Sequence, residues 1–226
     1  MDTPRERLLD AILGHAVFDG WSEAAFRAAT EDCGIDPALA RAHAPRGAVD
    51  LAADYHRRGD RQMVAALADA ALSNLRFRDR IAHAVRLRLD GADRELVRRG
   101  AALFALPQHA ATGAQLIWGT ADAIWTALGD TSRDINWYSK RATLSAVYSA
   151  TVLYWLGDES EGHQATWDFL DRRIEGVMRF EKTKAQLRDN PVLSKLLAGP
   201  LDIIGRVRAP EGQAGLPGQM KEDPTT

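Results

Sequence analysis

Aromatic and acidic side chains at helical spacing are the residues of this chain that could hold a ligand. Trp118, Asp122 and Trp125 stand at positions i, i+4 and i+7, so a helix places all three on one face. Two indoles around a carboxylate form either a binding wall with one polar anchor, or a core face in which Asp122 bonds an indole N–H or an arginine. The sequence leaves both interpretations open.

A second aromatic stretch covers residues 134–156. Asp134 suits the positive end of a helix dipole, and Trp137 and Tyr138 follow in the first turn. These two neighbours should point to different sides of the helix, so we expect at least one of them to be exposed and open to a partner. Inward residues are expected to line an apolar pocket together with the three residues above: Leu144, Tyr148, Val152, Trp155 and, from the next helix, Trp167.

Patterns typical of catalysis, metal binding or nucleotide binding do not occur in the sequence. It holds no GxxxxGK[ST] or GxGxxG loop, no HExxH and no Glu-x-x-His pair, and its six histidines are spread along the chain. Its one cysteine, Cys33, excludes an intrachain disulfide and any multi-cysteine metal site. We therefore predict no catalytic residue, no metal and no cofactor, with an enzyme of unrecognised mechanism as an alternative.

The elements that position these residues are all helical. Of the 226 residues 46% are apolar, and they recur at three- and four-residue spacing without a period-2 strand. Gly59-Asp60 indicates a break between two helices. Helices are predicted over 4–20, 22–33, 36–44, 46–57, 62–89, 93–104, 109–128, 134–156 and 162–188, followed by an apolar stretch at 191–205 that Pro200 should divide.

The first helices follow a helix-turn-helix plan, typical of TetR-type regulators. We divide the chain into a helix-turn-helix-like head (1–60), a helical bundle (61–190) to which the resemblance given below assigns lipid binding, an amphipathic helix (191–208) and a disordered tail (209–226). Residues 1–63 hold eight Arg and no Lys against eleven acidic residues, a charge of −3. DNA recognition needs several Lys or Arg side chains that contact phosphates. The negative charge of this head therefore predicts that it does not bind nucleic acid. A ligand-responsive TetR-type regulator remains the alternative function.

One long motif carries a resemblance to a known family. The motif is ADxxWxxxGDxSxDxNWYxKRAxL, followed by TWxFLxRRI. Over about residues 5–205 the chain resembles the ubiquinone (coenzyme Q) biosynthesis accessory proteins, which have a TetR-like fold. Ser139 stands where the common form has threonine.

That resemblance implies an all-α protein without catalysis of its own. Such a protein binds a lipid or isoprenoid quinone intermediate and presents it to the demethoxyubiquinone hydroxylase at a membrane surface. The implied partner-binding residues are Asp134, Trp137 and Tyr138, with Ile124 and Arg141 as neighbours. A homodimer through the long helices is one arrangement that the sequence leaves open.

The segment 191–208 is amphipathic, with an apolar stripe and cations on the other side. It either packs on the bundle or docks on a membrane through Leu193, Lys195, Leu196, Leu197, Leu201 and Ile204. No apolar stretch reaches the ~18–20 residues of a membrane-spanning helix. The N-terminus has no apolar signal core, which predicts an intracellular protein. The resemblance further implies a cytoplasmic protein peripheral to the inner membrane, or one on the matrix side if it is mitochondrial and processed.

Overall fold

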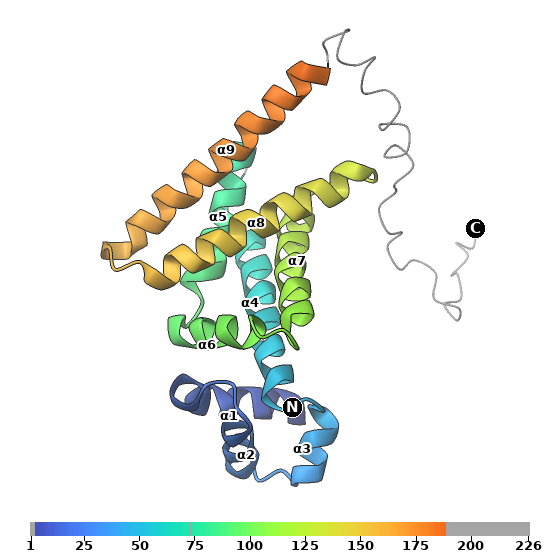
Figure 1. Ribbon diagram of the computed structural model, residues 1–226, viewed down its shortest axis with the longest axis vertical. Helices are drawn as coiled ribbons and strands as arrows, with labels where there is room; N and C mark the ends of the chain where they lie inside the picture. The colour runs from blue at the N-terminus through green and yellow to red at the C-terminus, as the bar shows by residue number, and fades with distance from the viewer. Residues whose placement is uncertain (1–2, 73, 189–226) are drawn as a thin grey trace, which may run out of the picture.

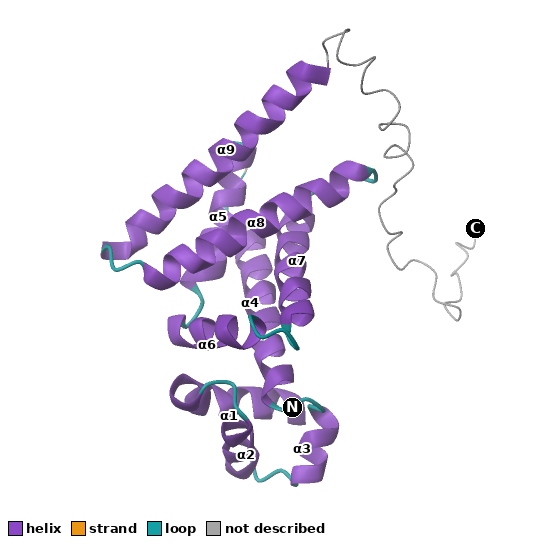
Figure 2. Ribbon diagram, in the orientation of Figure 1, coloured by secondary structure: helices purple, strands orange, loops and turns teal. Residues whose placement is uncertain are grey.

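A computed structural model of the chain describes residues 3–72 and 74–188, with side chains described as far as residue 179. Within these residues every regular element is helical and no strand occurs, as the apolar spacing predicted (Figure 2). Short loops join the helices.

Three short helices form the head: α1 (Pro4–Asp19), α2 (Glu23–Asp32) and α3 (Pro37–His43). Each begins at a residue whose side-chain oxygen accepts a hydrogen bond from the first turn: Thr3, Ser22 and Asp36. Thr3 and Glu6 complete a capping box. These caps explain why the helix starts could be predicted to within a residue.

Helix α4 (Ala48–Asp69) is longer than predicted, and the expected break at Gly59-Asp60 is wrong. Gly59 lies inside the helix, where an added Cβ would stand 2.7 Å from the guanidinium of Arg88. The glycine therefore makes room for a packed arginine and does not end the helix. The chain leaves the helix at Ala70 and α5 (Phe77–Asp90) follows, so the predicted helix 62–89 is the end of α4 plus α5.

The bundle continues with α6 (Arg94–Phe104), α7 (Ala110–Ala127), α8 (Ile135–Gly157), a 3-10 turn (Glu161–His163) and α9 (Gln164–Arg188). Helix α8 packs on α7 and α9, and α6 lies between the head and the bundle (Figure 1). Buried residues form two hydrophobic clusters: one joins the head to α6 through residues such as Leu8 and Leu96, and one fills the bundle around Ile124 and Leu170. Helix α4 contributes to both clusters, and residue 60, the predicted domain boundary, lies within it.

The C-terminal predictions lie outside the described residues. They comprise the amphipathic segment 191–208, the tail 209–226 and the membrane residues Leu193, Lys195, Leu196, Leu197, Leu201 and Ile204. Among the helices that the structure does describe, none is both long and apolar enough to cross a membrane.

Candidate functional site

The loop between α7 and α8 is organised around the buried carboxylate of Asp130, whose side chain is 2% exposed. It accepts hydrogen bonds from Lys140 Nζ at 2.7 Å, Ser132 Oγ at 2.8 Å and Arg141 Nη1 at 3.0 Å. Burial by itself would raise the pKa of Asp130, but these hydrogen bonds outweigh burial and lower the pKa to about 2. The loop is therefore held in one conformation by a fully charged group.

Arg141 links this loop to α7. Its Nε donates to Asp122 Oδ1 at 2.5 Å, and its guanidinium lies 4.0 Å from the centroid of the Trp137 ring. Asp122 thus pairs with an arginine and lines neither of the cavities described below, which corrects its predicted role as a lipid anchor. Arg141 is 2% exposed, so it positions Trp137 and is not itself available to a partner.

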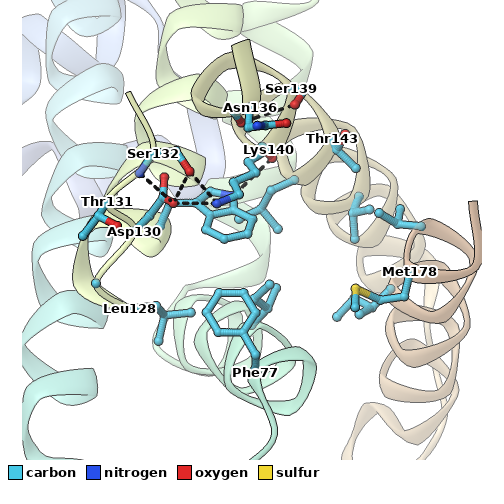
Figure 3. Close-up of a pocket in the computed structure, with 17 residues that line it drawn as sticks. Phe77, Leu128, Asp130, Thr131, Ser132, Asn136, Ser139, Lys140, Thr143 and Met178 are labelled. Carbon is cyan, nitrogen blue, oxygen red and sulfur yellow. Dashed lines mark hydrogen bonds and ion pairs between the residues drawn. The ribbon is translucent and has the colours of Figure 1, made fainter. Parts of the chain in front are cut away.

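A cavity of about 550 Å³ opens beside this loop, between α5, α8 and α9 (Figure 3). We name it the first cavity. Figure 3 shows Phe77 and Leu128 on one side and Met178 on the opposite wall, with Lys140 reaching toward Asp130 and Ser132 at one end. Further apolar walls come from Ile81, Trp125, Leu144, Val147, Ile174 and Val177, and polar groups come from Thr131, Asn136, Ser139 and Thr143.

Trp125 lines the first cavity with its aromatic ring. Its Nε1 donates to the Lys140 carbonyl at 3.1 Å, and its ring lies 5.3 Å from the Phe77 ring. The Lys140 ammonium lies 5.0 Å from its centroid. Trp125 and Leu144 thus line a cavity with apolar walls, and their contact with a lipid stays a prediction.

The other predicted wall residues lie elsewhere. Tyr148 and Val152 line a second cavity of about 410 Å³, between α4, α6, α7 and α8. Trp155 and Trp167 are buried in the bundle core, with 3% and 7% exposure, and line neither of these two cavities. The residues predicted to line one pocket are therefore divided between two cavities and the bundle core, because helical spacing identifies an inward face without showing which neighbour it meets.

Three aromatic residues gather at the end of α8 nearest the loop. Trp118, Trp137 and Tyr138, named here the aromatic surface cluster, are each half-buried. The Trp137 ring meets Tyr138 edge-on at 4.8 Å, and Trp118 lies 5.9 Å from Trp137 and 6.4 Å from Tyr138. Trp118 therefore belongs to this surface and not to an inner wall, which corrects its assignment.

The remaining predicted partner residues divide by exposure. Asp134 is exposed and caps α8 by accepting from Asn136 N. Ile124 is fully buried, so the prediction that it contacts a partner is wrong: it packs in the bundle core beneath the surface. Its position one residue before Trp125 gave no sign of which side would face outward.

Asp130, Ser132 and Lys140 are functional candidates that sequence reasoning did not single out. All three belong to the GDxS and KR parts of the motif, and a turn residue followed by cations was the available signal. No sequence signal pointed to Phe77 and Met178, because they reach the first cavity only through the packing of α5 and α9. Among the described residues no three His, Cys, Asp or Glu side chains come together as a metal site.

Comparison with known proteins places this region in a family context. Residues 110–181 match the model of the COQ9 family. The match covers α7, α8 and much of α9, hence the loop, the aromatic surface cluster and most residues of the first cavity. The chain is related to the COQ9 proteins.

Three relatives show the extent of the likeness. The mitochondrial ubiquinone biosynthesis protein COQ9 of Drosophila melanogaster is 30% identical over 192 residues, covering 82% of this chain and 59% of that protein. The probable Dictyostelium discoideum COQ9 is 27% identical over 191 residues, covering 81% and 62%. The Rattus norvegicus COQ9 is 36% identical over 90 residues, covering 40% and 29%. This chain thus spans less than two thirds of the length of these COQ9 proteins.

Among solved structures, a TetR transcriptional regulator from Nitrosomonas europaea matches with a TM-score of 0.62 and 20% sequence identity. The match covers 77% of this chain and 97% of the regulator. At this identity the likeness concerns the fold alone, and it confirms the predicted TetR-like all-α fold.

Proposed function

We propose that this chain is a non-catalytic lipid-binding protein of ubiquinone biosynthesis. It holds an isoprenoid quinone intermediate in the first cavity and presents it to the demethoxyubiquinone hydroxylase at a membrane surface. The observation that carries the proposal is the position of the first cavity, most of whose lining residues lie in the COQ9-matched region and which combines an apolar interior with a polar end.

The first cavity suits a lipid with a small polar head. Its volume of about 550 Å³ falls in the range of small-molecule sites, and its interior is formed by aromatic and aliphatic side chains. At one end the Lys140 ammonium is already neutralised by Asp130 at 2.7 Å. A head group with oxygens but without net charge, such as a quinone or phenol ring, therefore fits this end better than a phosphate or carboxylate.

The aromatic surface cluster suits a protein partner. Half-buried tryptophan and tyrosine side chains are enriched at interface hot spots. Arg141 and Asp130 fix Trp137 and the loop before any partner arrives, so little conformational freedom would be lost on binding. We assign this surface to the hydroxylase.

The regulator alternative finds no support in the head. Arg41, a cation of the helix that would read DNA, is ion-paired with Glu23 and stacks on Phe26. Arg46 is paired with Asp50 at 2.8 Å. Cations that are already neutralised release few counterions from phosphates, so they provide little DNA affinity.

Organic extraction of the purified protein, followed by mass spectrometry, tests the lipid assignment. Thr143→Phe places a ring in the first cavity, whereas the same change at exposed Thr126 of α7 leaves the cavity untouched. We expect quinone precursors from the wild type and Thr126→Phe, and a loss of most of that lipid from Thr143→Phe. Equal lipid content in all three proteins, or none in the wild type, would refute the assignment.

Partner and membrane binding have separate tests. Tyr138→Ala should weaken capture of the hydroxylase, while Tyr154→Ala, an exposed tyrosine toward the other end of α8, should not. Deleting residues 191–226 should reduce flotation with liposomes that contain anionic lipid. Unchanged capture by Tyr138→Ala would contradict the partner surface, and unchanged flotation would contradict the membrane role of this segment.

A further inference from the structure

The second cavity lies where the head meets the bundle. Ala52, Tyr55 and His56 of α4 line one side, and Arg88 of α5 together with residues of α6, α7 and α8 line the others. Its walls are mostly apolar, including Val97, Phe104, Leu116, Ile117 and Val152. With about 410 Å³ it has the volume of a small-molecule site, and neither the lipid nor the partner assignment uses it.

Polar groups at its inner wall form one connected network. Arg88, with a side chain 4% exposed, donates through Nε to Asp60 Oδ1 at 2.8 Å and through Nη2 to the His56 carbonyl at 3.0 Å. Thr120 Oγ1 donates to Asp60 Oδ1 at 2.9 Å, and His56 Nε2 lies 2.8 Å from Thr120 Oγ1. Thr120 Oγ1 also lies 3.3 Å from the Leu116 carbonyl, and the tautomer of His56 sets which group donates in the His56–Thr120 contact.

The positive and negative charges of this network balance each other. One cation, Arg88, faces one anion, Asp60, and burial lowers the pKa of His56 to about 4, so the imidazole is neutral at physiological pH. A charged ligand would enter a largely apolar cavity without a counter-charge of its own, at high desolvation cost. The ligand that fits is therefore uncharged.

Tyr55 and Ser149 bring hydroxyl groups to the wall of the second cavity. The Tyr55 oxygen accepts from Asp93 N at 3.0 Å, and no acceptor for its own proton is found in the described part of the chain. Ser149 also lines the cavity with its hydroxyl. A ligand oxygen that only accepts hydrogen bonds satisfies both groups.

We propose that the second cavity binds an uncharged, mainly apolar molecule with a carbonyl or ether oxygen, which accepts a hydrogen bond from Tyr55. The cavity is bounded by α4 on one side and by α6, α7 and α8 on the others, so the bound molecule would contact both hydrophobic clusters. This site is distinct from the first cavity, and the inference does not depend on which lipid that cavity holds.

Titration with the fluorescent ketone prodan, an uncharged naphthalene, tests this site on the full chain. Ala114 of α7 lines the second cavity, so Ala114→Phe places a ring in it. Ala111 is exposed on the same helix and does not line this cavity, so Ala111→Phe is the matched control. Thr143→Phe serves as the control for the first cavity. We expect Ala114→Phe to raise the Kd for prodan about tenfold or more, since a ring there occupies ligand space, and the two controls to change it less than about twofold.

Two further measurements test the chemistry of the site. The anionic probe anilinonaphthalene sulfonate should bind the wild type and Ala114→Phe equally, because the second cavity does not accept a charged ligand. Tyr55→Phe should raise the Kd for prodan about fivefold, as expected for one hydrogen bond, and shift its emission to the blue; Ser149→Ala gives a second reading if Tyr55→Phe melts early.

The possible results separate cleanly. Prodan binding that Thr143→Phe removes and Ala114→Phe does not would overturn the proposal and place the ketone in the first cavity. Absence of prodan binding to the folded wild type would overturn it as well. Loss of lipid from Thr143→Phe bears only on the proposed function.

Discussion

Replacing Asp130 by asparagine keeps the size of the side chain but removes the charge that holds the α7–α8 loop. In the folded protein the pKa of Asp130 is about 2, compared with 3.8 for an ordinary aspartate. Each pKa unit corresponds to about 1.4 kcal/mol, so the charged form contributes about 2 kcal/mol to the free energy of unfolding at neutral pH. Asp130→Asn should therefore lower this free energy by about 2 kcal/mol at pH 7, and the melting temperature by about 4–8 °C.

The same substitution has a distinctive pH dependence. Because the folded-state pKa of Asp130 lies below the unfolded value, its contribution is complete above about pH 5 and is lost as the pH falls toward 2. About 1 kcal/mol of it has gone by pH 3. Urea unfolding at both pH values should show the difference between wild type and variant shrink by about that amount.

A control and a refuting result complete this experiment. Asp134→Asn changes an exposed carboxylate that caps α8, and asparagine caps helices equally well, so we expect an effect under about 0.5 kcal/mol. An Asp130→Asn variant as stable as the wild type at pH 7, or a difference that does not change with pH, would show that the charge does not hold the loop.

Three further predictions follow from individual contacts. Trp137→Ala should weaken hydroxylase binding at least tenfold in a pull-down titration, as expected for an interface hot spot, whereas Phe18→Ala, 79% exposed on the head, should leave it unchanged. Gly59→Ala should lower the free energy of unfolding by about 1–3 kcal/mol because its Cβ would stand 2.7 Å from a buried guanidinium, while Gly14→Ala, with open space around it, should raise it by up to about 1 kcal/mol in thermal melts. Burial lowers the pKa of His56 to about 4, so stability should be complete above about pH 6.5 and fall by up to about 3 kcal/mol toward pH 4; a His56→Gln variant with the same pH profile would contradict this.

The starts of the helices with side-chain caps were predictable because the signals that set them are local, whereas the start of α5, which has no side-chain cap, was missed. Asp36 and Pro37 start α3, and Asp134 starts α8, through hydrogen bonds to residues two or three positions away. Gly59 misled because its role is set by Arg88, 29 positions later in the chain. A glycine that admits a distant side chain has the same local sequence signal as a glycine that ends a helix.

The candidate site was predictable in part for the same reason. Trp125 and Leu144 lie on inward faces at helical spacing, and both line the first cavity. Trp118 also lies at that spacing, but the α7–α8 loop turns Trp137 and Tyr138 onto it, so it joins the surface. Which of two inward tryptophans is covered by core and which by a loop depends on packing between helices, and no periodicity within one helix encodes it.

Helix α4 supports both hydrophobic clusters, and this has a consequence for folding cooperativity. Leu51 and Met63 are each at most 1% exposed, one packed in the cluster of the head and one in the cluster of the bundle. A continuous helix of 22 residues spans about 33 Å, so neither half can unwind at its inner end without exposing apolar surface in both clusters. The head and the bundle are therefore one cooperative unit, and amides near the middle of α4 should exchange with solvent only through global unfolding.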